Sequence, residues 1–116
     1  MKYAIITILI SIGAASSAQA AGVRQIECSA FLGGYDVETI LVDIGADGKA
    51  ESVQYVDHQG PVGPFLKTST NTFEYGPESL VINEVITIAD DLRNATVVVV
   101  YKDGGRVAKT AHFTCE

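Results

Sequence analysis

The two cysteines of this chain, Cys28 and Cys115, lie 87 positions apart, and this spacing constrains the fold more than any other feature. In an exported chain such a pair is typical of a disulfide, and the alternatives are free thiols or an intermolecular bond. In the chain-entropy model, closing a loop of this length stabilises a domain by about 4 to 5 kcal/mol. We therefore expect the first and last parts of the domain to meet in space.

The first twenty residues have the order of a cleavable signal peptide. A basic start at Lys2 is followed by an apolar stretch to about Ala15 and by small residues ending at Ala20. The apolar stretch is shorter than the roughly 20 residues of a membrane-spanning helix, and no stop-transfer charges follow it. The sequence predicts a signal peptide over 1–20, with an uncleaved anchor as the alternative, and a single domain over 21–116. The mature protein is then periplasmic or secreted, without membrane insertion.

The charge balance narrows the classes of partner. The formal net charge is −6, from 8 basic and 14 acidic residues, and loss of Lys2 would leave 7 basic residues and a charge of −7. The basic residues are scattered and form no run, so nucleic acid and anionic membranes should repel the domain. A basic protein would be attracted. The alternative is that the charge serves only solubility.

Period-2 alternation of apolar residues dominates the chain after the signal peptide and predicts an all-β domain. A Gly/Pro-rich stretch over 57–64 follows the third predicted strand, and we predict that it is the longest loop. Asp47-Gly48 is a strong hairpin turn, and Gly33-Gly34 offers another. The predicted strands cover residues 25–31, 37–44, 49–56, 65–75 (broken near 69–71), 80–88, 95–101 and 106–115.

Three segments carry more particular expectations. Residues 84–93 also match helical spacing. We favour a strand to about Ile88 and leave open whether a short helical turn forms around 90–94. The run Val97–Val100 predicts a central strand covered on both faces. Lys109 falls on the apolar side of the last strand, which predicts a position near a rim where its ammonium reaches water.

The strand count and the cysteine positions together predict a fold class. Each cysteine lies on the apolar face of a terminal strand, as is needed if first and last strands are neighbours. We predict a small antiparallel meander barrel of seven or eight strands, closed by the one disulfide. A two-sheet β-sandwich is the alternative.

Residues able to carry chemistry are few. Asp57 and His58 lie beside the Gly/Pro-rich segment, where a carboxylate and an imidazole offer a general base. Adjacent strand residues point to opposite faces, so a solvated histidine is the favoured interpretation. The chain has none of the common nucleophile, zinc, redox or nucleotide motifs, and we predict that it is not an enzyme. The candidate binding loop comprises Asp57, His58, Gly60, Pro61 and Pro64.

Two acidic pairs offer oxygen atoms that calcium could bind. Asp43 and Asp47 flank the first hairpin, and Asp90 is followed by Asp91. Calcium takes six to eight oxygens, and neither pair stands in a loop that supplies them. We expect no metal and no cofactor, and we place His112 on the outer surface.

Two short segments carry a resemblance to a known family. Ile26-Glu27-Cys28 stands in the predicted first strand, and Phe113-Thr114-Cys115 in the last. In outline most of residues 21–116 resembles the small periplasmic C-type lysozyme inhibitors, in which one disulfide ties an antiparallel barrel that blocks a cationic muramidase. That family carries a Ser-Gly-x-x-Tyr inhibitory segment, and no serine of this chain precedes a glycine. The resemblance therefore implies the disulfide positions and no inhibitory residue.

Three functions follow as hypotheses, in descending order. The first is a non-enzymatic binding or inhibitor-like module of the cell envelope whose partner is a cationic protein. The second is a small β-barrel that holds an apolar ligand. The third is a hydrolase using His58. The aromatic residues expected near the mouth of a ligand-binding barrel are Tyr55, Phe65, Phe73 and Tyr75.

Overall fold

The computed structural model describes residues 24–31 and 37–116 of the chain. The predicted signal peptide and the Gly33-Gly34 turn lie outside the described residues. Within these two ranges there is no helix long and apolar enough to cross a membrane. The described strands are β2 (Arg24–Phe31), β3 (Val37–Ile44), β4 (Ala50–Asp57), β5 (Gly60–Val62), β6 (Leu66–Ser69), β7 (Thr72–Tyr75), β8 (Ile82–Ile88), β9 (Asn94–Tyr101) and β10 (Val107–Cys115).

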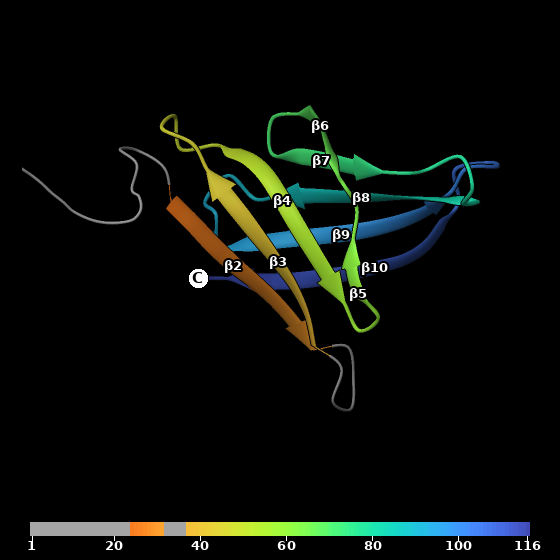
Figure 1. Cartoon of the computed structure of the whole chain (residues 1–116), viewed down its shortest axis with the longest axis horizontal. Helices are drawn as coiled ribbons and strands as arrows, with labels where there is room; N and C mark the ends of the chain where they lie inside the picture. Colours follow the sequence, from red (N-terminus) through yellow and green to blue (C-terminus); the bar gives the residue numbers. More distant parts are fainter. Residues whose placement is uncertain (1–23, 32–36) are drawn as a thin grey trace, which may run out of the picture.

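All of these strands belong to one antiparallel sheet with the order β5-β4-β3-β2-β10-β9-β8-β7-β6 (Figure 1). The sheet curls through 265° and remains open, so that it forms a half-barrel. The predicted all-β class and antiparallel meander are confirmed. The predicted strand number and full closure are wrong: the described sheet has nine strands, and its edges β5 and β6 do not pair. Because there is a single sheet, the sandwich alternative is wrong as well.

The disulfide joins two neighbouring strands in the middle of this sheet. Cys28 in β2 lies directly opposite Cys115 in β10, with their Cα atoms 3.9 Å apart. The backbones of Glu27 and Glu116 exchange two hydrogen bonds. The next pair, Cys28 and Cys115, is therefore a non-hydrogen-bonded pair, and the Cα atoms of such pairs lie closer together in an antiparallel sheet. The predicted meeting of first and last strands is therefore confirmed. The bond closes the half-barrel between β2 and β10, and the opening that remains lies between the edge strands β5 and β6.

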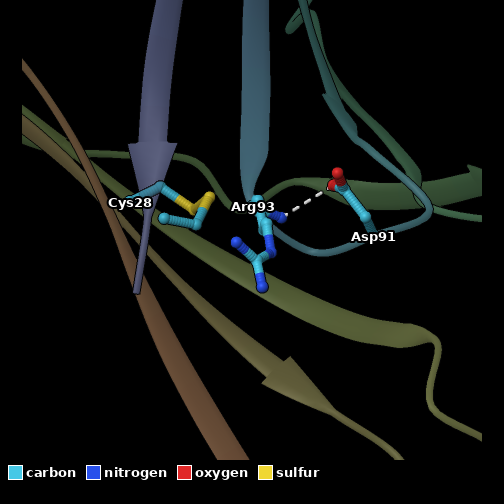
Figure 2. The surroundings of a disulfide bond; sticks show 4 residues. Cys28, Asp91 and Arg93 are labelled. Carbon is cyan, nitrogen blue, oxygen red and sulfur yellow. Dashed lines mark hydrogen bonds between the residues drawn. A yellow bond between two sulfur atoms is a disulfide. The ribbon is translucent and has the colours of Figure 1, made fainter.

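A turn after β8 packs beside the disulfide (Figure 2). The Arg93 amide donates a hydrogen bond of 2.9 Å to the Asp91 carboxylate, and the Arg93 carbonyl accepts one of 2.8 Å from the Cys115 amide. Strand β8 ends at Ile88 as predicted, but residues 90–93 form a turn and not a helical segment. Leu92 adopts φ 62° there and packs against the core.

The core covers the concave face of the sheet. Apolar side chains that alternate with polar ones point inward from the strands, as the period-2 pattern predicted. Its largest buried members include Phe73, Phe113, Ile40, Ile44, Ile86 and Ile88.

Two details of β9 and β10 differ from the prediction. Val97 is buried, but Val98 and Val100 on the outer face are only partly buried, so β9 is central without being covered on both faces. Val107 is 56 % exposed, although the alternation placed it beside Ala111. The register of β10 against β9 shifts between Val107 and Lys109, and this irregularity breaks the alternation.

The predicted long loop over 57–64 is a short hairpin. The β4 strand ends at Asp57, a turn of two residues follows, and Gly60 begins β5. Pro61 lies within β5 opposite Val56. A proline lacks the amide that a central strand needs, but β5 is an edge strand where one side is unpaired. The prediction was wrong because proline excludes a residue from the interior of a sheet and not from its edge.

Near the opening, side chains replace the missing strand pairing. Asn71, in the turn between β6 and β7, is buried and accepts a 2.9 Å hydrogen bond from the Ala50 amide at the start of β4. The Lys67 ammonium donates to the Ala50 carbonyl over 2.9 Å. The Asn71 carbonyl also accepts a bond from the Ile88 amide. We call these contacts the Asn71 clasp, and they hold one end of the half-barrel together.

We predict that replacing both cysteines by alanine lowers the free energy of unfolding by about 4 to 5 kcal/mol, because the unfolded chain gains the freedom of an 87-residue loop. Urea unfolding of C28A/C115A measures this loss. Native protein unfolded in the presence of reductant should show the same midpoint. An unchanged midpoint in the double variant would contradict the prediction.

We predict that Asn71→Ala destabilises the fold by about 2 to 4 kcal/mol. The substitution leaves the Ala50 amide without its partner and puts an alanine at φ 57°, where alanine is strained. Asn71→Gly removes the hydrogen bonds alone and should cost less. Urea unfolding midpoints of both variants measure these losses of stability, and Thr70→Ala, at an exposed position, is the control. Equal losses of stability for Asn71→Ala and Thr70→Ala would refute the prediction.

Candidate functional site

The concave face has an apolar end and an end that carries ionisable side chains. Because the strands are antiparallel, the starts of β3, β8 and β10 and the end of β4 lie at the same end of the half-barrel. Each of these strands places a polar residue there, in the same alternation that buries its apolar neighbours. We call this group the polar end: Glu38, Tyr55, Asp57, Glu84 and Lys109.

Glu38 is the centre of the polar end. It is 1 % exposed, and the Tyr55 hydroxyl donates a hydrogen bond to its Oε1 atom. Lys109 Nζ lies 3.7 Å from Oε2, and His58 Nδ1 lies 4.0 Å from the same atom. A buried carboxylate is costly unless it is paired, so these three neighbours account for its position inside the sheet.

The remaining carboxylates of the polar end add negative charge around Glu38. Burial raises the pKa of Glu84, the charges of Asp57 and Glu38 raise it further, and Lys109 opposes them. Burial also raises the pKa of Tyr55, and so do its hydrogen bond to Glu38 and the charge of that residue. The Tyr55 hydroxyl therefore keeps its proton and remains the donor to Glu38.

An aromatic row runs from the polar end toward the opening of the sheet. The rings of Tyr55 and Phe65 meet edge to face at 6.1 Å, and those of Phe65 and Tyr75 lie 5.4 Å apart. Tyr55 also contacts Phe113 of the core at 6.2 Å. A groove of about 380 Å³, which we call the aromatic groove, is lined by Val53, Tyr55, Pro61, Val62, Pro64 and Phe65 among others.

The structure separates the predicted binding loop into two parts. Asp57 and His58 lie at the polar end, and the His58 imidazole faces Glu38, whereas the Asp57 carboxylate accepts a bond from the Gln59 amide. Pro61 and Pro64 line the aromatic groove. Gly60 lines neither and adopts φ 121°, a conformation that glycine allows. Lys109 is half-exposed while its ammonium approaches Glu38, in agreement with the predicted rim position.

The interpretation of the sequence missed Glu38, Tyr55 and Glu84 as members of one site. A pattern that could have found them is present: Glu38 precedes Ile40 and Val42 at intervals of two, and Glu84 precedes Ile86 and Ile88 in the same way. Charged residues in phase with an apolar face mark inward carboxylates.

The acidic pairs considered for calcium are used in other ways. Asp43 accepts hydrogen bonds from Gln25 and Ser52, and Asp47 accepts one from the Lys49 amide. Across residues 24–31 and 37–116, no three His, Cys, Asp or Glu side chains group as metal ligands. His112 is exposed on the outer face, as predicted.

This arrangement is suited to holding a positive group. Three carboxylates face one lysine and one histidine, and aromatic rings that attract cations line the adjoining groove. No protein-family model, no curated protein and no solved structure matches this chain.

We predict that Glu84→Gln stabilises the fold at neutral pH and loses this effect below about pH 4. The pKa of Glu84 is higher in the folded chain, so folded stability falls as the pH rises through 4.5, the value of the free carboxyl, and on through the folded value. Thermal unfolding across this pH range measures the effect. Exposed Glu74→Gln changes the net charge equally, and a gain at Glu84 no larger than at Glu74 would contradict the prediction.

Proposed function

We propose that this protein is a non-enzymatic binding module exported to the cell envelope, and that it recognises a cationic protein through the polar end of its half-barrel. The observation that carries the proposal is the excess of carboxylates at this end, where Glu38, Asp57 and Glu84 lie with a single lysine, Lys109. The overall charge of −6 has the same sign and would steer a basic partner toward the domain.

The rigid framework supports a role in recognition. A disulfide in the middle of the sheet and the Asn71 clasp at its other end limit the movement of the strands that carry the site. A site held in place before binding loses less conformational entropy when a partner binds. Export would supply the oxidising environment that a disulfide needs.

Inhibition of a C-type lysozyme is the particular form of this function that we propose. The resemblance to periplasmic inhibitors of that enzyme rests on the cysteine positions, and a disulfide-tied antiparallel half-barrel agrees with it in outline. Since the Ser-Gly-x-x-Tyr segment is absent from the sequence, contacts with the enzyme would have to come from other residues, and we assign them to the polar end.

A second candidate is a binding protein for a small apolar ligand. The aromatic groove favours it, because Val53, Val62 and Phe65 give an apolar lining and its volume of about 380 Å³ lies in the range of small-ligand sites. Native mass spectrometry of the purified protein would detect a bound small molecule. A protein that copurifies with none and takes up no apolar dye would argue against this candidate.

We predict that the oxidised protein forms a complex with a C-type lysozyme at low salt, and that the complex weakens as salt rises from about 20 to about 500 mM. Asp57→Asn should weaken it by a few-fold, the size of one charge contact near a surface. Surface plasmon resonance measures both effects. The electrostatic proposal would be overturned if the affinity stayed the same in high salt. It would also be overturned if the protein bound neither lysozyme nor polylysine.

The chain offers a matched control for this substitution. Asp47 and Asp57 both accept a hydrogen bond from the amide two residues later, at 2.9 and 2.7 Å, and asparagine keeps this acceptor. Asp47 lies in the β3–β4 turn, at the opposite end of β4 from Asp57. Asp47→Asn should therefore remove the same charge without weakening the complex beyond the effect of net charge.

A further inference from the structure

Among residues 24–31 and 37–116, only one oxygen of the buried Glu38 carboxylate has a hydrogen-bond donor. Tyr55 donates to Oε1, whereas within the described part of the chain no donor lies at hydrogen-bonding distance from Oε2. The Lys109 ammonium and the His58 imidazole, at 3.7 and 4.0 Å from Oε2, are beyond the usual hydrogen-bond range of about 2.7 to 3.2 Å. Buried carboxylate oxygens are normally satisfied, so this atom has the capacity to accept a further donor.

The two side chains beside Glu38 Oε2 are much more exposed to solvent than Glu38 itself. The side chains of Lys109 and His58 are 49 % and 53 % exposed, while that of Glu38 is 1 % exposed. Lys109 has a long stem that allows its ammonium to turn into water at small cost. A competing cation could therefore take the place of the Lys109 ammonium.

The aromatic groove and the Glu38 carboxylate share one neighbour, Tyr55. Tyr55 lines the groove and is also the residue that donates to Glu38, and Phe65 packs against the Tyr55 ring. Aromatic rings next to a carboxylate form a favourable path for an alkylammonium group, since the rings contact its carbons and attract its charge.

We propose that Glu38 is the anchor for a lysine side chain of the partner, and that Lys109 occupies this place until the partner binds. This inference rests on the proposed function and names the group that the polar end recognises. An ammonium suits this place because it needs only Oε2 as acceptor, whereas a two-pronged arginine contact would have to share Oε1 with Tyr55. In the complex the Lys109 ammonium moves into solvent.

The first test uses n-butylammonium as a substitute for a lysine side chain. Lys109→Ala in the full, oxidised chain removes the ammonium nearest to Glu38, and n-butylammonium at ten times its dissociation constant should raise the melting temperature by about 7 °C. Tetramethylammonium, which cannot donate a hydrogen bond, is the control and should raise it less. The double variant K109A/E38Q should not respond to n-butylammonium. Equal responses to both salts would overturn the proposal.

The second test uses a C-type lysozyme and does not depend on the folding of Lys109→Ala. Glu38→Gln keeps the acceptor for Tyr55 and removes the charge, so it should weaken the complex about tenfold. Lys109→Ala, where folded, should strengthen the complex more than Lys49→Ala, which removes a positive charge from the exposed β3–β4 turn.

The outcomes separate this inference from the proposed function. If the native protein binds lysozyme and Glu38→Gln binds it equally well, Glu38 is not the anchor, and the proposal of a cationic partner still stands. If the native protein binds neither lysozyme nor polylysine, the proposed function fails, and the n-butylammonium measurement still decides whether Glu38 accepts an ammonium ion.

Discussion

The pairing of β2 with β10 is the contact on which the other parts of the structure depend. It brings the first and last described strands together, and the Cys28–Cys115 bond makes it permanent in the oxidised protein. All other strand pairs join strands that follow one another in the chain and are separated by few residues. The β2–β10 pair alone has a long loop to close, so it carries most of the entropic cost of the topology, which the disulfide reduces.

The position of this pair also decides where the half-barrel opens. With the chain ends in the middle of the sheet, the edges fall on β5 and β6, which are neighbours in the chain. The Asn71 clasp holds the sheet together at one end of this opening, and the aromatic groove lies beside β5. The candidate site is therefore a consequence of incomplete closure, because a ninth pairing between β5 and β6 would cover the groove that leads to Tyr55.

Local pattern predicted much of the fold. Alternation identified the inward faces of β2 and β3 through residues such as Ile26 and Val42, and Asp47-Gly48 marked a true hairpin turn. It did not predict β5, because Pro61 excludes a central strand but not an edge, and it misplaced Val107, because an irregular register depends on the partner strand. Lys109 was recognised as out of pattern, but its partner Glu38 is 71 positions away in the chain and no local rule connects them.

The sequence by itself determined the all-β class, the inward faces of most strands and the pairing of its two cysteines, since these follow from a period of two and from the number of thiols. Only the tertiary structure decided that the sheet stays open and that Glu38, Tyr55, Glu84 and Lys109 share one end of it. The physical reason is that curl and register are set by packing between strands that are distant in sequence, and a side chain meets its neighbours across a sheet only when both are settled.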